Sequence, residues 1–503
     1  MPIYQSPSNH LQKRQETMSV TVKSDDVQPR TTCEVYHAVG PLDLRPSVQS
    51  SFFYYLHHVL ARSQSQKSIN KFEKRNRFGL KNKIKSLIKN IYPSGNSLGK
   101  YHSISSYQCD VIFNFFASSP HSLGIQRKLA EQCQLAGLKT GMVGIFAQRR
   151  DRNLLAIDLP EFDHIFPLQQ FNEIFEFNLP RISRQKIIEQ CRHIQLSLEK
   201  FGCSSPNASE YLAECAIQVE KKACIFQRLL EEVNPKIVIL SHGKTMEDAA
   251  MLIACHKADK KSMLVPHGFP QKSMAPIHAS IVTSFGPHHD RYLKDISRSS
   301  TQIMKLGWLE PSTTLKNNVC NISDNSSRNK EKYNVLFLSS LSGWEIHRCE
   351  SLLERVPDIL KTLNKMPEIE TINVRLRHNE YNDLVIKTLL SSCAGSKLRR
   401  SGMNNPISDD LNACDIIISF NSTALLYGPY LNKKSIEIRD QKINSVWGSS
   451  VLPSKQVYQI NEVFDSQDFC QFILDSPVLK GNSVFYNWGH ELKTFSDYLK
   501  SIV

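Results

Sequence analysis

The chain has no apolar run long enough to cross a membrane. Its 503 residues contain no stretch approaching the roughly 18 uninterrupted apolar residues that a transmembrane helix needs. Residues 1–26 are polar and lack the apolar core of a secretory signal. We therefore expect a cytoplasmic protein without a membrane-spanning helix.

Paired cysteine motifs are also absent. The 13 cysteines are scattered, and no two of them form a Cys-x-x-Cys pair. Several stand in apolar or helical surroundings, namely Cys215, Cys224, Cys255 and Cys414. Small buried side chains explain such cysteines better than disulfides or zinc ligands do, so we expect no metal site.

The sequence contains no zinc-finger, recognition-helix or aromatic RNA-binding pattern, so the net charge of +14 does not indicate a nucleic-acid partner. Most of that charge lies between Arg62 and Lys100, where eleven basic residues stand against Glu73 alone. Apolar residues recur there at near-helical spacing. This basic amphipathic segment is typical of an element that docks on an anionic membrane surface, or of a solvated helix packed by its apolar stripe. Both alternatives stay open.

Composition and length predict a globular protein with two ordinary domains. Apolar residues make up 41% of the chain and charged residues 22%. We predict an N-terminal extension over 1–107, loosely ordered over 1–50, and a first α/β domain over 108–318. A polar linker follows over 319–332, and a second α/β domain covers 333–503.

Strands alternate with helices in both domains. Apolar runs predict strands at 109–116, 140–146, 236–240, 262–266 and 281–285, and then at 333–338, 371–376, 415–420 and 434–439. Helical patterns between them cover 123–136, 209–233, 245–257 and 348–363. This alternation predicts parallel βαβ units, hence an α/β fold of two Rossmann-like parallel-sheet domains that face a central cleft.

The strand Asp415–Phe420 leads into a loop of small hydroxyl residues. Ser422 and Thr423 would lie at the carboxyl end of this strand, where a new helix begins. Free N–H groups at a helix N-terminus beside hydroxyls are typical of a phosphate site. The pattern therefore predicts that this loop binds the phosphate of a nucleotide-sugar.

Two other strands of the second domain are also followed by polar side chains. Ser339 and Ser340 follow one strand, and Arg377 and His378 follow another. Arginine binds phosphate bidentately, and hydroxyls complete such a site. We predict that the nucleotide-sugar is bound by Ser339, Ser340, Arg377, His378, Ser422 and Thr423.

The first domain offers candidates for proton transfer. His267 and His121 each follow a predicted strand, and a histidine near neutrality can remove the proton from an attacking hydroxyl. Beside His242, the residues Glu247 and Asp248 offer carboxylates. Glu310 lies near the end of the first domain and could face the cleft, but we interpret it in preference as a solvated loop acid.

Asp409 and Asp410 precede a short helical segment that ends near Cys414. Acidic side chains there are typical of helix caps, and we interpret them so in preference to ligand contacts.

Several short segments, in a fixed order, are similar to bacterial surface-polysaccharide glycosyltransferases of the GT-B fold. They are Pro266–Gly268, Ile281–Gly286, His288–Leu293 and Lys305–Glu310, followed by Asp415–Thr423, which resembles a D-(I/V)-(I/V)-x-x-x-S-T pattern. The resemblance covers roughly residues 108–500.

The resemblance implies a nucleotide-sugar donor held mainly by the second domain and a glycan or glycolipid acceptor held mainly by the first. It also implies catalysis without a bound metal or other cofactor, and work at the inner face of the cell membrane. Two residues depart from the pattern, since Asn379 replaces a proline and Tyr427 replaces a ribose-binding glutamate. Either ribose is held differently, or the donor is a CMP-sugar, or the chain is an inactive copy.

Three other functions fit a similar scaffold. A nucleotide-sugar 2-epimerase and a polymer glycerophosphotransferase keep the fold and change the chemistry, while a polysaccharide-assembly protein keeps it without catalysis. The epimerase is disfavoured because its Gly-Gly signature beside the phosphate-binding serine is missing here. Tyr427 is the best support for the non-catalytic alternative.

Overall fold

A computed structural model describes most of the chain beyond residue 107, together with one segment before it. The described residues are 44–55, 108–116, 120–145, 159–167, 180–200, 208–243, 245–266, 268–269, 274–311, 315, 332–339, 350–377, 380–381, 384–393, 395–420, 422–440, 450–460 and 464–502. Within these residues, no helix combines the length and the apolarity that a membrane span needs.

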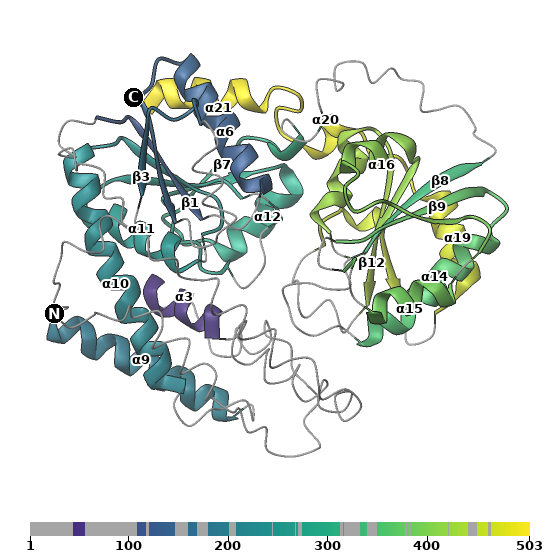
Figure 1. Cartoon of the computed structure of the whole chain (residues 1–503), viewed down its shortest axis with the longest axis horizontal. Coiled ribbons are helices and arrows are strands. Elements are labelled where there is room, and N and C mark those ends of the chain that lie inside the picture. Colours follow the sequence, from purple (N-terminus) through teal and green to yellow (C-terminus); the bar gives the residue numbers. More distant parts are fainter. Residues whose placement is uncertain are drawn as a thin grey trace, which may run out of the picture. The chain divides into compact units, whose positions relative to one another are not determined.

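The first sheet has seven parallel strands in the order β3-β2-β1-β4-β5-β6-β7 (Figure 1). Its central strands are short apolar runs, and all four residues of β4 are buried, as expected for a strand covered on both faces. The strands are β1 (Val111–Phe116), β2 (Thr140–Ile145), β3 (His164–Pro167), β4 (Ile237–Leu240), β5 (Lys261–Leu264), β6 (Ile281–Ser284) and β7 (Gln302–Lys305).

The second sheet has six parallel strands in the order β10-β9-β8-β11-β12-β13. Its register places Ser419 beside Leu338 on one side and Glu437 on the other. The strands are β8 (Tyr333–Leu338), β9 (Ile369–Arg375), β10 (Leu398–Arg400), β11 (Ile416–Ser419), β12 (Lys434–Asp440) and β13 (Val457–Ile460).

Helices connect the strands and cover the sheets. Between residues 120 and 296 the helices are α6 (Pro120–Leu135), α9 (Arg181–Lys200), α10 (Ala208–Val233), α11 (Met246–Lys257) and α12 (Pro287–Ile296). Between residues 350 and 502 the helices are α14 (Glu350–Lys365), α15 (Leu384–Ser392), α16 (Ile407–Ala413), η7 (Thr423–Leu426), α17 (Tyr427–Tyr430), η8 (Ser454–Gln456), α19 (Ser466–Asp475), α20 (Gly481–Val484) and α21 (Glu491–Ile502). Apolar residues of α14, α15 and α19 form one core with the six-stranded sheet.

Two parallel α/β sheets confirm the predicted fold class. The predicted strands and helices lie within a few residues of the observed ones in both halves. The chain divides into two compact units, one from the described parts of Met1–Pro120 with Gly137–Met263, the other from His121–Ala136 with Leu264–Val503. The predicted domain boundaries and the cleft stay predictions, because residues 319–331 of the linker lie outside the described residues.

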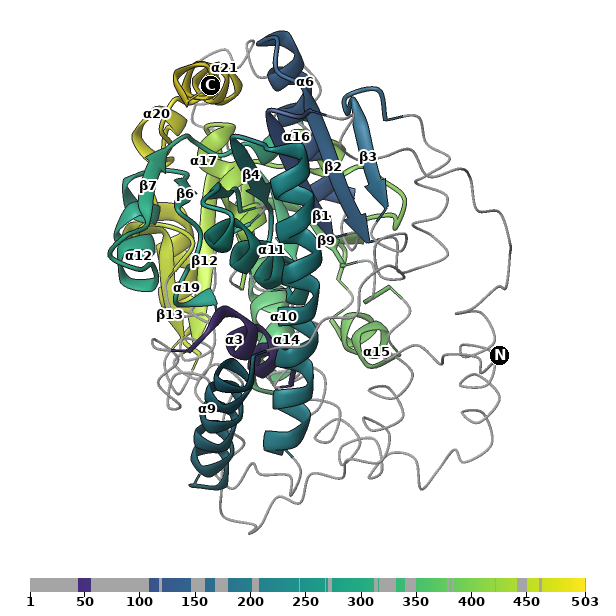
Figure 2. The same cartoon turned by 90° about the vertical axis from the view of Figure 1, so that its left-hand side faces the viewer.

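The expectation that the N-terminal extension is loosely ordered over residues 1–50 is wrong for residues 46–50. Helix α3 (Pro46–Tyr55) includes the last residues of the segment expected to be loosely ordered, and it lies beside α9 and α10 (Figure 2). Val48 and Phe52 of this helix are fully buried in a core shared with those two helices. Short-range sequence patterns did not indicate this docking, because its stability comes from residues more than 100 positions away. The basic segment 62–100 lies outside the described residues.

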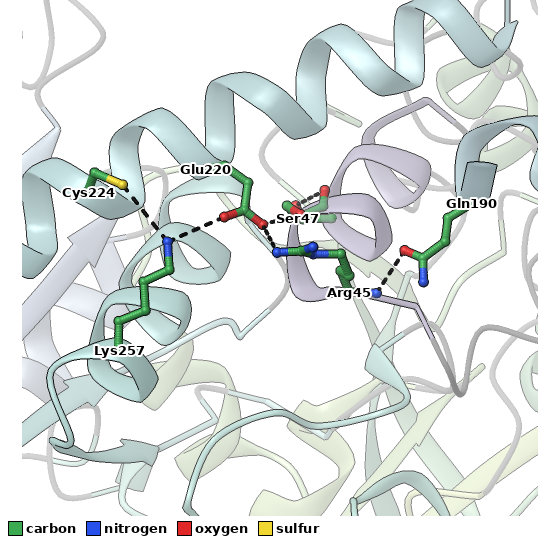
Figure 3. Close-up of polar contacts among 7 residues, drawn as sticks. Arg45, Ser47, Gln190, Glu220, Cys224 and Lys257 are labelled. Carbon is green, nitrogen blue, oxygen red and sulfur yellow. Dashed lines mark hydrogen bonds and ion pairs between the residues drawn. The ribbon is translucent and has the colours of Figure 1, made fainter. Parts of the chain in front are cut away.

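A buried carboxylate holds the start of α3 on α10. Glu220 accepts hydrogen bonds from the guanidinium of Arg45 at 3.1 Å and the hydroxyl of Ser47 at 3.0 Å. The ammonium of Lys257 on α11 lies 3.6 Å from its other oxygen (Figure 3). Only 1% of the Glu220 side chain is exposed, so its charge depends on these partners.

Replacing Glu220 with glutamine is expected to loosen α3. The amide oxygen can still accept the hydrogen bond of Ser47, but Arg45 and Lys257 lose their buried counter-charge. We expect the amides of α3 to exchange with solvent at least about tenfold faster, which corresponds to about 1.4 kcal/mol of local stability. Hydrogen-exchange mass spectrometry of peptides spanning residues 46–55 measures this.

A matched control uses Glu247, which pairs with Lys222 at 2.8 Å in a more exposed position. Surface ion pairs contribute roughly 0–1 kcal/mol, so Glu247→Gln should change α3 exchange by less than about threefold. Equal exchange of α3 in Glu220→Gln and the wild type would contradict the proposed clamp.

Candidate functional site

The polar residues predicted to bind phosphate lie at one edge of the six-stranded sheet. Ser339 follows β8, Arg377 follows β9, and Ser422 follows β11 closely. Because the strands are parallel and β8 pairs with both β9 and β11, their carboxyl ends meet at this edge. The structure therefore brings three of the predicted loops together. Ser340 and His378 lie outside the described residues.

A buried glutamate that the sequence analysis missed connects two of these loops. Glu380 is fully buried and accepts a hydrogen bond from the hydroxyl of Ser339 and one from the backbone N–H of Arg377, the latter at 2.9 Å. Burial lowers the pKa of the Arg377 guanidinium, and the Glu380 carboxylate opposes that shift. The sequence signal that could have indicated Glu380 is its position three residues after Arg377.

The helix that follows the Ser422-Thr423 loop is shorter than expected. It consists of the four-residue 3₁₀ turn η7 and the four-residue helix α17, in which Pro429 lacks a backbone N–H. The hydroxyl of Ser422 caps η7 by accepting a hydrogen bond from Ala424 N–H at 3.4 Å. Such a short helix has little dipole, so a phosphate at this loop would be bound by hydroxyl and N–H groups with little help from a helix dipole.

Thr423 contacts the loop that contains Gly268 and Phe269. Its hydroxyl oxygen accepts a hydrogen bond from the backbone N–H of Phe269 at 3.0 Å, across 154 residues of sequence. A Cβ atom on Gly268 would lie 3.1 Å from the same oxygen, so the close approach favours glycine. The Pro-His-Gly segment and the Asn-Ser-Thr loop are therefore neighbours, although His267 itself lies outside the described residues.

The ring of Phe269 packs on α12, the helix that carries the His-His-Asp-Arg-Tyr motif. It stacks on Tyr292 with ring centres 5.3 Å apart, and it lies 4.9 Å from the ring of His289. Burial lowers the pKa of His289 to about 3, so this histidine is neutral at physiological pH. Its Nδ1 accepts the N–H of Phe285 at 2.9 Å. We infer that His289 is a packing residue that fixes the loop.

Glu310 is not the solvated loop acid that the sequence suggested. It begins a helical turn after β7, and its carboxylate accepts a hydrogen bond from the hydroxyl of Tyr427 at 3.4 Å. Burial raises the pKa of Glu310 to about 7, and the Tyr427 hydroxyl partly opposes that shift. The error arose because Tyr427, whose hydroxyl contacts this carboxyl, is 117 positions away in the sequence.

The interpretation of Asp409 and Asp410 as helix caps is wrong for Asp410. The N-cap of α16 is Pro406, without a side-chain cap hydrogen bond. The Asp410 carboxylate instead bonds Arg375 at 2.5 Å and Asn373 at 2.7 Å, both on β9. This buried ion pair fixes α16 against the sheet.

The first compact unit contains Asp248, one of the two carboxylates near His242 in the sequence. Asp248 is fully buried and accepts hydrogen bonds from Asn114 at 2.7 Å and from Gly243 N–H at 2.9 Å. Burial raises its pKa to about 6, and these hydrogen bonds oppose the shift. Gly243 has a φ of 70°, so Asp248 holds a left-handed turn after β4.

His121 lies on a helix and not on the predicted loop. Helix α6 begins at Pro120, a favoured first position because proline needs no N–H partner there, so His121 is its second residue. Among the described residues, no group of three His, Cys, Asp or Glu side chains is placed to hold a metal ion. The roles of His121 and His267 stay predictions.

Comparisons with known proteins give only distant similarity. No protein-family model and no curated protein matches the chain. Among solved structures, the UDP-GlcNAc 2-epimerase of Neisseria meningitidis bound to UDP-GlcNAc is 13% identical, with a TM-score of 0.42, over 77% of this chain and 99% of that one. MurG of Acinetobacter baumannii is 10% identical, with a TM-score of 0.45, over 78% and 99%. A glycosyltransferase of Rickettsia africae is 12% identical, with a TM-score of 0.40, over 78% and 93%.

Replacing Thr423 with valine is expected to weaken the contact between the two motif loops. Valine keeps the shape of threonine but leaves the Phe269 N–H without its acceptor, which costs about 1 kcal/mol for a partly buried donor. Thr423→Ser keeps the hydroxyl and serves as the control. Urea unfolding should show the loss in Thr423→Val and a change below about 0.5 kcal/mol in Thr423→Ser; equal losses would indicate that the methyl group matters and the hydrogen bond does not.

Proposed function

We propose that the protein is a glycosyltransferase that moves a sugar from a nucleotide-sugar donor to a growing surface polysaccharide or glycolipid. The observation that carries the proposal is the contact between Phe269 and Thr423. It joins the Pro-His-Gly segment to the hydroxyl loop at the carboxyl end of β11, and these are the two motifs that resemble the glycosyltransferases. Ligands of open α/β sheets bind at such strand ends.

Arg377 is the centre of the proposed donor site. Burial lowers the pKa of its guanidinium. A nearby phosphate would therefore be attracted more strongly by this arginine than by one that water surrounds. The Glu380 carboxylate links Ser339 to Arg377, because it accepts a hydrogen bond from the Ser339 hydroxyl and one from the backbone N–H of Arg377. Ser340, His378, Ser422 and Thr423 complete the proposed set, with Thr423 acting in part through the loop that it holds.

Proton transfer by His267, with His121 as a second candidate, belongs to the same proposal. The chain would need no resident metal or cofactor, because the nucleotide-sugar is a co-substrate. The tyrosine at position 427 supports a CMP-sugar as one donor candidate, since the glutamate that commonly binds ribose is missing there.

The acceptor and the location complete the proposal. A lipid-linked glycan acceptor would place the protein in the cytoplasm, at the inner face of the cell membrane. The basic segment 62–100 supports this through its charge, because eleven cationic side chains attract anionic lipid head groups.

Nucleotide binding tests the donor proposal directly. The purified protein is heated with UDP, GDP, CDP or CMP and their sugar conjugates, and we expect one nucleotide class to raise the melting temperature. The conjugates of that class should also be slowly hydrolysed. A protein that responds to none of these nucleotides would contradict the proposed function.

Removing the charge of Arg377 should weaken this binding. A charge-assisted hydrogen bond contributes about 1.5–3 kcal/mol, so Arg377→Gln should raise the Kd of the nucleotide by about 10- to 150-fold in calorimetric titration. Arg399, on the edge strand β10, is exposed, and Arg399→Gln is the matched control that should leave the Kd unchanged. Equal effects of the two variants would indicate general charge attraction.

A further inference from the structure

The connection from β3 to β4 contains two long helices, although one helix is enough for a crossover between parallel strands. Helix α10 leads directly into β4, whereas α9 packs on α10 and α3 (Figure 2). The buried stripe of α9 consists of Ile187, Cys191, Ile194 and Leu198. These four side chains fill the core that the three helices share, so the opposite face of α9 has no part in that core.

Two large apolar side chains stand on this opposite face. Ile182 is 72% exposed and Leu196 is 59% exposed. Their positions in the sequence place them about 40° apart around the helix axis and about 21 Å apart along it. The other large apolar side chains that are exposed among the described residues, Leu135, Met403 and Val478, lie singly elsewhere. Of the described helices, α9 alone carries two.

Exposed cations accompany these apolar side chains. The five are Arg181, Arg184, Lys186, Arg192 and Lys200. Lys186 and Arg192 lie on either side of the line from Ile182 to Leu196, each about 40° from the nearer apolar residue. The exposed acids of the helix are Glu189, which lies between the two apolar residues, and Glu199. The face is therefore cationic on balance and amphipathic.

The structure of the chain itself does not use these charges. Within the described ranges none of the five cations forms an ion pair, whereas Lys222 and Lys257 on the neighbouring helices do. The N-terminus of a helix carries a partial positive charge, so cations there destabilise the helix. Arg181 and Arg184 nevertheless stand at the start of α9, whose first turn has no acidic residue. A partner outside the chain explains them best.

The chemistry of this face favours an anionic lipid surface. Cations attract lipid phosphates while aliphatic side chains enter the boundary of the acyl chains, and the long stems of Lys and Arg keep their charges at the head groups. A nucleic acid is disfavoured, because α9 contains no Phe, Tyr or Trp on which a base could stack. A second copy related by a two-fold axis would bring two cationic faces together.

We propose that the exposed face of α9 is a docking surface for a membrane that contains anionic lipid. The inference goes beyond the proposed function, which assigned membrane contact to the segment 62–100 alone, and it holds whatever group the protein transfers. Ile182 and Leu196 enter the head-group boundary, and Lys186 and Arg192 contact lipid phosphates on either side. The buried stripe of α9 then connects the membrane surface to the rest of the first compact unit.

Binding to vesicles tests the charges. The full chain is sedimented with vesicles of phosphatidylcholine that contain about one third phosphatidylglycerol, and with vesicles of phosphatidylcholine alone. Each cation near an anionic bilayer contributes about fivefold in affinity, so Lys186→Gln with Arg192→Gln should weaken binding to the anionic vesicles by about 20- to 30-fold. The matched control removes two exposed cations of α10, Lys221→Gln with Arg228→Gln, and should change binding by less than about threefold.

A fluorescent side chain tests the apolar contact at one position. Ile182→Trp adds an indole to the exposed face, and we expect its emission to shift to the blue and to be quenched by lipids brominated in the acyl chains. The wild type, with its four tryptophans, gives the background. Leu135→Trp is the matched control, because Leu135 is 74% exposed at the end of α6, and it should add no quenching.

Three results would overturn the proposal. They are wild-type affinity of the α9 double variant for anionic vesicles, equal affinity of the wild type for both kinds of vesicle, and an unquenched Ile182→Trp. The first of these, with tight binding of the wild type, would assign membrane contact to other residues. Nucleotide binding is measured separately and should be unchanged in the α9 double variant. A wild type without any nucleotide response contradicts the proposed function instead, whatever the vesicles show.

Discussion

The shared direction of β8, β9 and β11 is the constraint on which the candidate site depends. The carboxyl ends of parallel strands lie at one edge of the sheet, so polar residues that follow different strands become neighbours although they are far apart in the sequence. The register of Leu338 between Arg375 and Ser419 brings the three loops to the same level. An antiparallel strand at β8 would have moved its loop to the opposite edge.

Buried carboxylates fix the loops that leave this scaffold. Glu380 ties the Ser339 and Arg377 loops, and Asp410 ties α16 to β9. Asp248 and Glu220 do the same in the first compact unit. Each of these carboxylates has at least two donors, because a buried charge without partners costs several kcal/mol. These four buried carboxylates therefore act as structural anchors.

Glu310 differs from these anchors in the balance of its surroundings. The hydrogen bond that it accepts from the neutral Tyr427 hydroxyl is long, at 3.4 Å, whereas Asp410 bonds a guanidinium at 2.5 Å.

The sequence by itself determined the inner strands of both sheets and several of the helices between them, because apolar periodicity and turn residues act over a few neighbouring positions. It also indicated that Ser339, Arg377 and Ser422 follow parallel strands. It did not indicate the edge strands β3, β7, β10 and β13. The helix at Pro46–Tyr55, the role of Glu380 and the setting of Glu310 were decided only by the tertiary structure. Their hydrogen-bond partners and their desolvation come from residues up to 175 positions away, and burial of a polar group depends on which surfaces the whole fold brings together.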